Sequence, residues 1–407
     1  MRPSSSSSPE PAGAQGPGAG PGLFDEVLAA GPVRDAVADR RWLAAMLEAE
    51  AALARAQAAL GLIPAEAAAA ITAACVPERY DLADIAAGAA GSGTPVLPLV
   101  TALRRAVPGE VRRYVHAGAT SQDILDTAAM LVAHRALGPL LADLDGAAEA
   151  AGDLARRYRD TPAAGRTLLQ HAVPVTFGLK AAGWLVALRE ARDLLVRVRT
   201  RRLAVQLGGA AGTLDAYGDA GPALVRRFAA ELGLAAPLLP WHTDRTRVAE
   251  LAGALATAAG VVGKAARDVT LLAQSEVGEV AEAAPGASSA MPHKRNPVAA
   301  VATLAAAAQA PGLAATVFGA MVQEHERAAG AWHAEWRPLR ELLVAAGSAV
   351  HWLRRCLSGL VVDEAAVARN LARLRAVAGE TAGGGTGAAA ALVDLALAAG
   401  DETGERP

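Results

Sequence analysis

The chain has 407 residues, of which 53% are hydrophobic and only 3% are aromatic, and its formal net charge is −2. This length exceeds what a single hydrophobic core usually serves, so two or three subdomains are expected. No long run carries one sign of charge, which argues against a basic surface for nucleic acid. Alanine and leucine dominate and favour helices, because they lose little side-chain entropy in a helix.

The cysteines and the N-terminus indicate the cellular compartment. Cys75 and Cys356 provide neither a disulfide framework nor metal-ligand spacing, and we interpret them as free thiols in a reducing cytoplasm. The start of the chain lacks the apolar segment of a signal peptide, so a cytoplasmic protein is expected. Residues 1–20 are rich in Ser, Pro, Gly and Ala, which predicts a disordered tail.

Helical patterns begin after this tail, in a predicted N-terminal helical domain over residues 21–117. Asp39 is a candidate cap for a helix whose apolar residues recur on one face. Gly61 and Pro64 end that helix. After a short helical region, residues 88–98 are predicted to be rich in loops.

A predicted central bundle of long helices occupies residues 118–362. Its first helix is expected to start near Thr120, because Thr120 and Asp123 have the spacing of a capping box. Gly138 and Pro139 are expected to kink or interrupt this helix.

Two further long helices are predicted in the central region. The stretch 161–174 is predicted to be a loop, and a helix is expected over 175–203. Glycines in 208–212 make a flexible break. The next helix is expected from Asp244 to a point before Pro285. No stretch shows the convincing alternation of apolar and polar residues, over several segments, that is typical of strands.

The segment 298–323 contains no charged residue and is long enough to suggest a membrane span. Gln309, Pro311 and Gly312 interrupt it, and alanine makes it only weakly apolar. We therefore expect a helix buried in a large bundle and no association with membrane. Long alanine-rich helices with few aromatic anchors bury their stripes best in an elongated bundle, which is expected to continue across subunits.

The loop from Gly286 to Pro297 carries a concentration of reactive groups between two predicted helices. Ser288, Lys294 and Asn296 supply a hydroxyl, an ammonium and an amide within nine positions. This set suits removal of a proton next to a carboxylate, because the cation, the amide and N–H groups at the next helix start stabilise the developing charge. Asn296 and Pro297 have the pattern of an N-cap and first helical residue. The alternative is a polar connector.

The loop closely resembles the signature of the fumarase/aspartase superfamily. Residues 116–123, His-Ala-Gly-Ala-Thr-Ser-Gln-Asp, resemble its first conserved region, and residues 165–174 resemble its second. The resemblance covers roughly residues 23–362. It implies an all-α, elongated helical bundle completed by homotetramerisation, with active sites assembled from three subunits and no cofactor or metal.

The same resemblance implies roles for individual residues. It makes Ser288 the base of the lyase direction. Catalytic positions are expected at Ser288, Lys294, Asn296 and His171. Substrate-binding positions are expected at His116, Thr120, Ser121, Gln170, Ser289, Met291 and Arg327. The alternatives are structural: Thr120 and Ser121 as helix caps, and His116 and His171 as structural histidines.

Leu168 departs from the pattern of many lyases, which place a histidine there to protonate the leaving group. Leucine transfers no proton, so either the enzyme is damaged or its leaving group departs as a stable anion, as a carboxylate does. Segments around 166–172, 207–213, 240–243 and 323–336 resemble the bacterial 3-carboxy-cis,cis-muconate cycloisomerases. That branch implies lactonisation of a tricarboxylate to 4-carboxymuconolactone in the protocatechuate branch of the β-ketoadipate pathway.

Two rival functions stay open. One is adenylosuccinate lyase or another fumarate-releasing lyase, although Leu168 and the lack of an obvious phosphate cradle argue against it. The other is a noncatalytic structural protein, against which Ser288, Lys294 and Asn296 argue. Residues 363–407 are predicted to be a truncated C-terminal helical segment, with a glycine-rich hinge at 383–385. This shortening puts closure of the active site in question.

Overall fold

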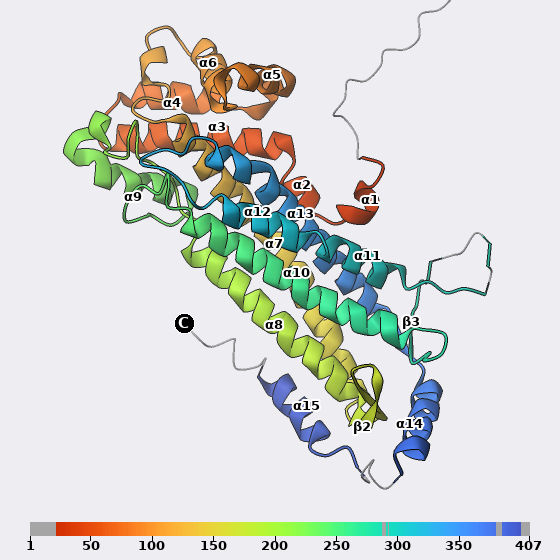
Figure 1. Ribbon diagram of the computed structural model, residues 1–407. Helices are drawn as coiled ribbons and strands as arrows, with labels where there is room; N and C mark the ends of the chain where they lie inside the picture. The colour runs from red at the N-terminus through yellow and green to blue at the C-terminus, as the bar shows by residue number, and fades with distance from the viewer. Residues whose placement is uncertain (1–21, 287–289, 292, 380–384, 400–407) are drawn as a thin grey trace, which may run out of the picture.

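The computed structural model describes residues 22–286, 290–291, 293–379 and 385–399. Within them the chain is almost entirely helical and elongated (Figure 1). The N-terminal helices are α1 (Asp25–Leu28), α2 (Val33–Ala36), α3 (Asp39–Ala59), α4 (Ala65–Ala74), α5 (Leu82–Ser92) and α6 (Val96–Ala106). Short 3-10 helices occur at η1 (Pro77–Arg79), η2 (Arg112–Tyr114) and η3 (Asp215–Ala220).

The prediction of a loop-rich stretch over 88–98 is wrong. Most of it belongs to α5 and α6, and only a tight connection separates the two helices. Gly93 has a φ of 69° and is the C-cap of α5, a position that favours glycine because the backbone is left-handed there. Pro95 directly precedes α6 as its N-cap. The glycine and proline therefore mark helix ends and not an extended loop.

Long helices form the body of the molecule and pack along one another. They are α7 (Ser121–Arg157), α8 (Phe177–Arg201), α10 (Thr246–Leu272) and α13 (Ala331–Ser358). α7 packs on α8 and α13, and α10 packs on α8 and α13. α9 (Gly221–Leu232) lies against α3 near the N-terminal helices.

α7 confirms the predicted capping box, since Thr120 and Asp123 cap each other's backbone at its start. It is one helix of 37 residues that runs through Pro139, so the expected interruption there is wrong. A proline inside a helix removes one backbone hydrogen bond and crowds the preceding turn. Burial of neighbouring side chains such as Leu137 and Leu140 offsets that cost, because both are fully buried in the core.

The segment 298–323 is helical as predicted, divided into α11 (Val298–Ala307) and α12 (Ala310–Gly319). Both helices pack on α10 and α13. By length and composition alone, the helical stretches 121–157, 246–272 and 298–319 would suffice to cross a membrane. In the structure they pack against other helices of the bundle, and this explains their apolar stripes.

A β-hairpin occupies the stretch that we expected to be a loop. β1 (Pro162–Thr167) pairs antiparallel with β2 (Gln170–Thr176), and α14 (Glu364–Ala378) packs on both strands. These strands depend on packing against α14, a contact that their own sequence does not predict. A smaller pair joins β3 (Val280–Glu282) to β4 (Leu360–Val362), and α15 (Ala389–Ala398) packs on α8.

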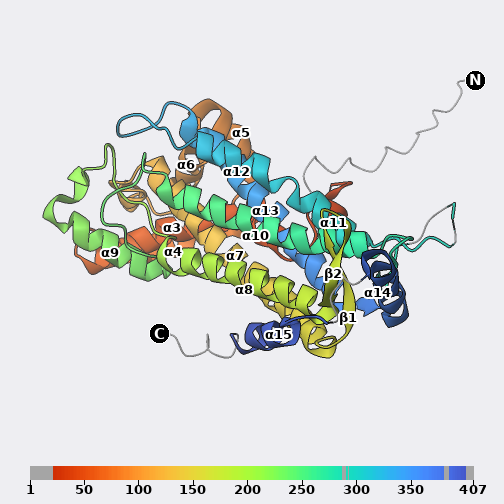
Figure 2. The same cartoon turned by 60° about the horizontal axis from the view of Figure 1, so that its bottom comes forward.

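The two ends of the bundle are built differently. In both views α3 to α6 and α9 lie at one end, and the hairpin and α14 lie at the other (Figure 2). α7 starts beside α3 and ends just before β1. At a rise of about 1.5 Å per residue, its length separates the two ends by roughly 55 Å.

Candidate active site

His116 occupies a strained turn just before α7. Its φ of 60° is unusual for a residue with a side chain. Gln57 Nε2 and the Tyr217 hydroxyl both donate to the Ala117 carbonyl, at 2.8 and 2.9 Å, and hold the turn from two sides. Gly118 follows with a φ of 76°, and a Cβ there would lie 2.6 Å from the Tyr217 ring. The local structure therefore fixes where His116 is presented.

Glu50 on α3 determines the charge of His116. The two side chains meet at 2.6 Å through His116 Nδ1, and Glu50 is only 1% exposed. Burial lowers the pKa of His116, but the charge and hydrogen bond of Glu50 outweigh it, so the pKa lies above its ordinary value. His116 Nε2 has no hydrogen bond among the described residues. A charged imidazole with a free donor suits a substrate carboxylate.

Asp123 connects the start of α7 to two other segments. It is fully buried, and its carboxylate accepts from the Gly208 and Gly209 amides at 2.9 and 3.0 Å. His242 Nε2 lies 2.7 Å from its Oδ1. The Thr120 amide also binds Asp123 Oδ2, at 2.9 Å. Thr120 and Ser121 thus lie at the positive end of the dipole of a long helix. The hydrogen bonds of Asp123 hold this helix start in place.

A buried ion network lies behind this helix start. Arg245 donates to Asp126 at 2.8 and 3.0 Å and to Glu335, whose Oε2 is 3.2 Å from Nε. All three side chains are nearly inaccessible, and Trp332 Nε1 adds a bond of 3.0 Å to Asp126. Burial and the nearby charge of Asp126 raise the pKa of Glu335 to about 7, although Arg245 opposes the rise. The network ties α7, α10 and α13 together.

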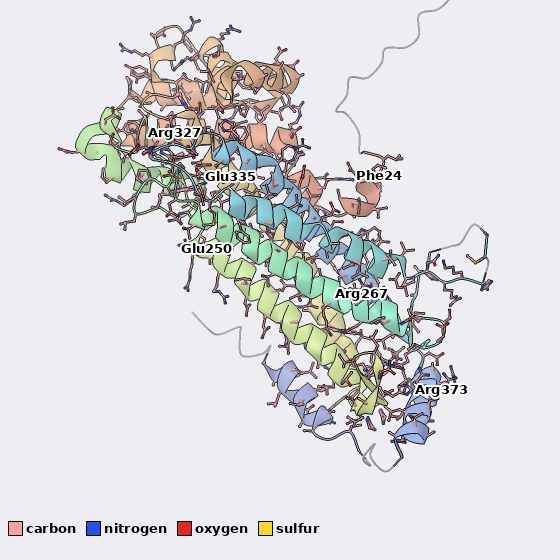
Figure 3. All side chains as sticks on the ribbon, viewed as in Figure 1. Phe24, Glu250, Arg267, Arg327, Glu335 and Arg373 are labelled. Carbon is pink, nitrogen blue, oxygen red and sulfur yellow. The ribbon has the colours of Figure 1, made fainter. Side chains whose placement is uncertain are left out.

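Arg327 joins the same end of the molecule. Its guanidinium donates to Gln122 Oε1 at 3.1 Å and to the carbonyls of Gly209 and Ala210 at 3.2 and 2.8 Å. Figure 3 shows Arg327 and Glu335 at this end, far from Arg373 on α14. We name His116, Thr120, Ser121, Asp123 and Arg327 the helix-start cluster. Within it Arg327 holds the glycine turn against α7.

The hairpin carries the second set of predicted residues. Arg166 pairs with His171 and Thr167 with Gln170, which leaves Leu168 and Leu169 as a two-residue turn. Both leucines have positive φ, 49° and 63°, and they are 96% and 71% exposed. Such a turn favours Asn-Gly, so two exposed leucines there are strained. Gln170 and His171 are exposed on β2 beside this tip.

The third set lies in the loop between β3 and α11. Ser288 and Ser289 lie outside the described residues. Lys294 and Met291 are exposed, and Asn296 closes the base of the loop through two backbone hydrogen bonds with Gly286, of 2.9 and 3.3 Å. We name the hairpin and the described residues of this loop the hairpin end, because Arg166 on β1 binds Glu279 just before β3.

The start of α11 differs from the expectation. Pro297 is its N-cap, while Asn296 Nδ2 contacts the Gly286 carbonyl at 3.5 Å and caps nothing. The amides of Ala299 and Ala300 bind the Glu282 carboxylate at 3.1 and 2.9 Å. These N–H groups are therefore occupied by the chain itself. We predicted that N–H groups at this helix start would stabilise charge on a substrate. For the amides of Ala299 and Ala300 that prediction is wrong.

The structure brings those predicted residues that it describes together in two groups and not in one. The helix-start cluster and the hairpin end lie at opposite ends of α7, roughly 55 Å apart by the helical rise. Side chains that act on one small substrate must lie within a few ångströms of it. One protomer therefore does not bring the predicted residues into a single site.

Comparison with known proteins places the chain in a family. A family described as Lyase matches residues 28–312. The chain belongs to this lyase family. It is 52% identical to nitrosuccinate lyase of Streptomyces davaonensis and 50% identical to 3-carboxy-cis,cis-muconate cycloisomerase of Pseudomonas aeruginosa. Each alignment covers 86% of this chain and 77% of the relative.

A solved structure agrees with this assignment. The 3-carboxy-cis,cis-muconate lactonizing enzyme from Pseudomonas putida superposes with a TM-score of 0.82 at 41% identity. The match covers 94% of this chain and 88% of that enzyme. The predicted all-α, fumarase/aspartase-type elongated bundle is confirmed, and so is the resemblance on which it rested.

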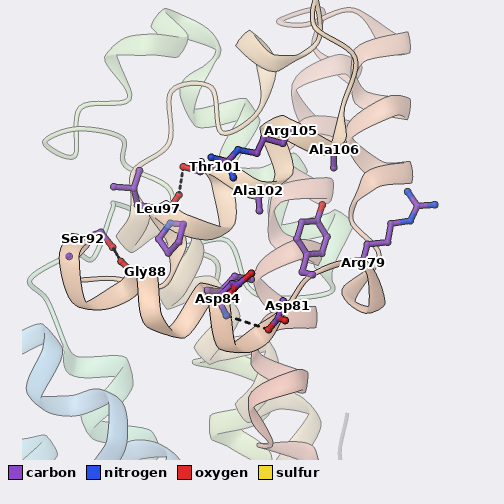
Figure 4. Close-up of a pocket in the computed structure, with 14 residues that line it drawn as sticks. Arg79, Asp81, Asp84, Gly88, Ser92, Leu97, Thr101, Ala102, Arg105 and Ala106 are labelled. Atoms are coloured by element: carbon purple, nitrogen blue, oxygen red, sulfur yellow. Dashed lines mark hydrogen bonds between the residues drawn. The ribbon is translucent and has the colours of Figure 1, made fainter. Parts of the chain in front are cut away.

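The cavity in Figure 4 is not built from the predicted residues. It has a volume of about 720 Å³ and lies between α5 and α6, lined by residues such as Asp84, Leu97 and Arg105. Its marked hydrogen bonds are local ones: the Asp84 amide donates to Asp81 Oδ1 at the start of α5, and the Ser92 and Thr101 hydroxyls donate to carbonyls one turn earlier in α5 and α6. No chemistry of the lyase family follows from it.

Sequence reasoning missed three residues that support the site. Glu50 was not singled out, His242 appeared only within the resembling segment 240–243, and Asp123 appeared only as a cap and as the last residue of the first conserved region. A charged residue in the middle of the alanine- and leucine-rich helix α3 was the available signal for Glu50. His242 carried no such signal, because its contact with Asp123 joins residues 119 positions apart.

Proposed function

We propose that this protein is a cofactor-free lactonising cycloisomerase that converts 3-carboxy-cis,cis-muconate to 4-carboxymuconolactone. The observation that carries the proposal is the hairpin tip, where the chain presents Leu168, 96% exposed, in place of a proton donor. A leaving group that departs as a carboxylate needs no donor. Relatives at 50% identity bear the name of this reaction, and the lactonizing enzyme of P. putida shares the fold.

In the lactonising direction the substrate supplies its own nucleophile. One carboxylate oxygen forms the new C–O bond to a carbon of the diene. The electron pair of that double bond moves toward the adjacent carboxylate, which becomes enolate-like. The neighbouring carbon then takes a proton through Ser288. Lys294 and Asn296 stabilise the enolate-like charge while it exists.

The remaining predicted residues bind the tricarboxylate. His116 is held as a cation by Glu50, and Thr120 and Ser121 stand at the positive end of α7. Together they suit one carboxylate. Gln170 and His171 are exposed next to the hairpin tip, where they can meet a second carboxylate. Ser289 and Met291 complete the set predicted from the loop.

We infer that the site is shared between protomers of a homotetramer. The roughly 55 Å between the helix-start cluster and the hairpin end is too long for one small substrate. The strained, exposed hairpin tip is suited to entering a site on another protomer. We also infer a cytoplasmic enzyme without nucleic-acid or membrane partners, from its charge and the packing of its apolar helices.

A second candidate is cleavage of nitrosuccinate, which the relative at 52% identity favours. Elimination from that substrate would release nitrite, which also departs as a stable anion. Leu168 therefore excludes a poor leaving group such as an amine, but it fits both nitrite and carboxylate. The cycloisomerase remains the main proposal, because the P. putida structure and the P. aeruginosa relative agree on it.

One experiment separates these functions. Purified full-length protein is mixed with 3-carboxy-cis,cis-muconate, nitrosuccinate or adenylosuccinate in separate reactions. Loss of the diene absorbance with formation of the lactone supports the proposal. Nitrite release from nitrosuccinate without lactone formation would establish the second candidate instead. Fumarate from adenylosuccinate alone would show that the argument from Leu168 is wrong.

A further inference from the structure

A second cavity lies between the hairpin and the facing turns of α8 and α10. Its volume is about 470 Å³, and its charged lining consists of Arg166, Lys180, Lys264 and Asp268. Gln170 and His171 of the predicted site lie on the same hairpin but do not line it. The cavity is thus separate from the residues to which the proposed reaction assigns a role.

The carboxylates near this cavity are already engaged. Glu279 accepts from Arg166 at 2.6 and 3.2 Å and from Asn370 Nδ2 at 2.9 Å. Asp268 Oδ2 accepts from Trp184 Nε1 at 2.7 Å and also from the Lys264 ammonium. Each carboxylate therefore has its own cation, and the pairs Arg166–Glu279 and Lys264–Asp268 are close to neutral.

Lys180 is the one cation of the described cavity lining that has no carboxylate partner of its own. Among the described residues its ammonium makes no ion pair within 4.0 Å and no hydrogen bond. Partial burial, the neighbouring guanidinium of Arg166 and a position in the first turns of α8, where the helix dipole is positive, oppose its charge. The carboxylates of Glu279 and Asp268 favour its charge, but each is already paired with another cation. In accord with these effects, burial lowers the pKa of Lys180 below its ordinary value.

The rest of the lining is apolar except for Gln274, whose side-chain amide donates to the Leu271 carbonyl at 2.8 Å. Leu169 reaches it from the hairpin, and Leu271, Leu272 and Val277 reach it from the end of α10 and the turn that follows. Leu169 is 71% exposed in the protomer, so its inner side can contact a ligand while the tip faces another protomer, as inferred above. An apolar wall beside one uncompensated cation favours an anion with an apolar body over an inorganic ion.

We propose that this cavity binds a small organic monocarboxylate, with the carboxylate paired to Lys180 and the apolar body against the leucine wall. One negative charge balances the single uncompensated ammonium. The ligand would connect α8 to the hairpin, since Arg166 and Leu169 belong to the hairpin and Lys180 belongs to α8. The inference does not depend on which reaction the enzyme performs.

Benzoate is the probe, because it combines one carboxylate with an apolar ring. Its binding to the full chain is measured by isothermal titration calorimetry for wild type, Lys180→Met and Arg267→Met. Lys180→Met is expected to weaken binding at least about tenfold, as the loss of a charge-assisted hydrogen bond predicts. Arg267→Met removes an exposed cation of α10 that does not line the cavity, so it should leave binding unchanged.

A further variant locates the binding site. His116→Asn is expected to bind benzoate as wild type does, which separates this cavity from the helix-start cluster. Thermal unfolding of each variant shows that the fold is kept. If wild type does not bind benzoate, or if Lys180→Met binds it equally well, the proposal is wrong. Neither result bears on lactone formation, which is assayed separately.

Discussion

The helix-start cluster and the hairpin end differ in how far their side chains are buried and held by partners. At the first, charged groups are buried and each is held by several partners: Asp123 binds two amides and a histidine, and Arg245 bridges two carboxylates. At the second, Leu168 and Leu169 are exposed in a strained turn. The first end is preorganised within one protomer, whereas the second exposes a strained turn on the surface of the protomer.

This difference in burial and strain predicts how substitutions at each end affect the stability of the fold. Buried charges are costly to remove from water, so each must keep its partners, and a lost partner destabilises the fold. An exposed strained tip gives up some stability, and such strain is common where a segment serves function. Variants at the first end should therefore lower stability or weaken binding, and variants at the second should change turnover or raise stability where they relieve the strained turn.

The largest effect is expected from breaking the buried network. Arg245→Met leaves Asp126 and Glu335 buried without their cation, so the free energy of unfolding should fall by about 3–5 kcal/mol. Urea denaturation measures it. The matched control is Arg192→Met, which removes an exposed pair with Asp145 and should cost at most about 1 kcal/mol. Equal losses in the two variants would contradict the importance of burial.

The next effect tests the hairpin end through its loop. Ser288→Ala should lower kcat for lactone formation by about 10³-fold, within the range of a lost proton carrier, with little change in unfolding. Ser289→Ala is the matched control and should retain most of kcat, because its predicted role is binding. Near-normal turnover in Ser288→Ala with intact folding would remove Ser288 from the mechanism.

A smaller effect is expected at Glu50, and it depends on pH. Glu50 keeps the pKa of His116 above its ordinary 6.5, so His116 stays charged above pH 6.5 until its raised pKa is passed. Glu50→Gln should raise KM about tenfold in that window and little below it, as a lost charged hydrogen bond predicts. The stabilisation from this pair is likewise full below pH 6.5 and lost through the raised pKa.

The control for this variant lies on the same helix. Glu48→Gln removes an exposed carboxylate of α3 that pairs with Arg135, far less buried than Glu50. Its KM should match wild type at every pH. A KM for Glu50→Gln that rises equally at pH 5.5 and pH 7.5 would argue for a merely structural role of Glu50.

The smallest effect tests strain at the hairpin tip. Replacing Leu168 and Leu169 by Asn and Gly supplies residues that accept positive φ, so the fold should gain about 1 kcal/mol. Thermal unfolding measures it. Leu238→Asn is the control, because Leu238 is 95% exposed but has no positive φ. An unchanged or lower melting temperature for the tip variant would show that the turn is not strained.

Much of the fold was determined by local sequence. α8 was predicted over 175–203 and spans Phe177–Arg201, and the capping box at Thr120 starts α7 as predicted. Helical periodicity and caps act between residues a few positions apart, so the sequence displays them directly. The signature loop also sufficed to indicate the lyase family to which the chain belongs.

Tertiary structure decided what local sequence does not encode. The hairpin forms under α14, which lies some 200 positions later, and Glu282 rather than Asn296 occupies the start of α11. The Glu50–His116 pair and the spare charge of Lys180 likewise depend on contacts between distant segments. Local patterns show which groups are present, whereas their charge, burial and partners are set by the packing of distant helices.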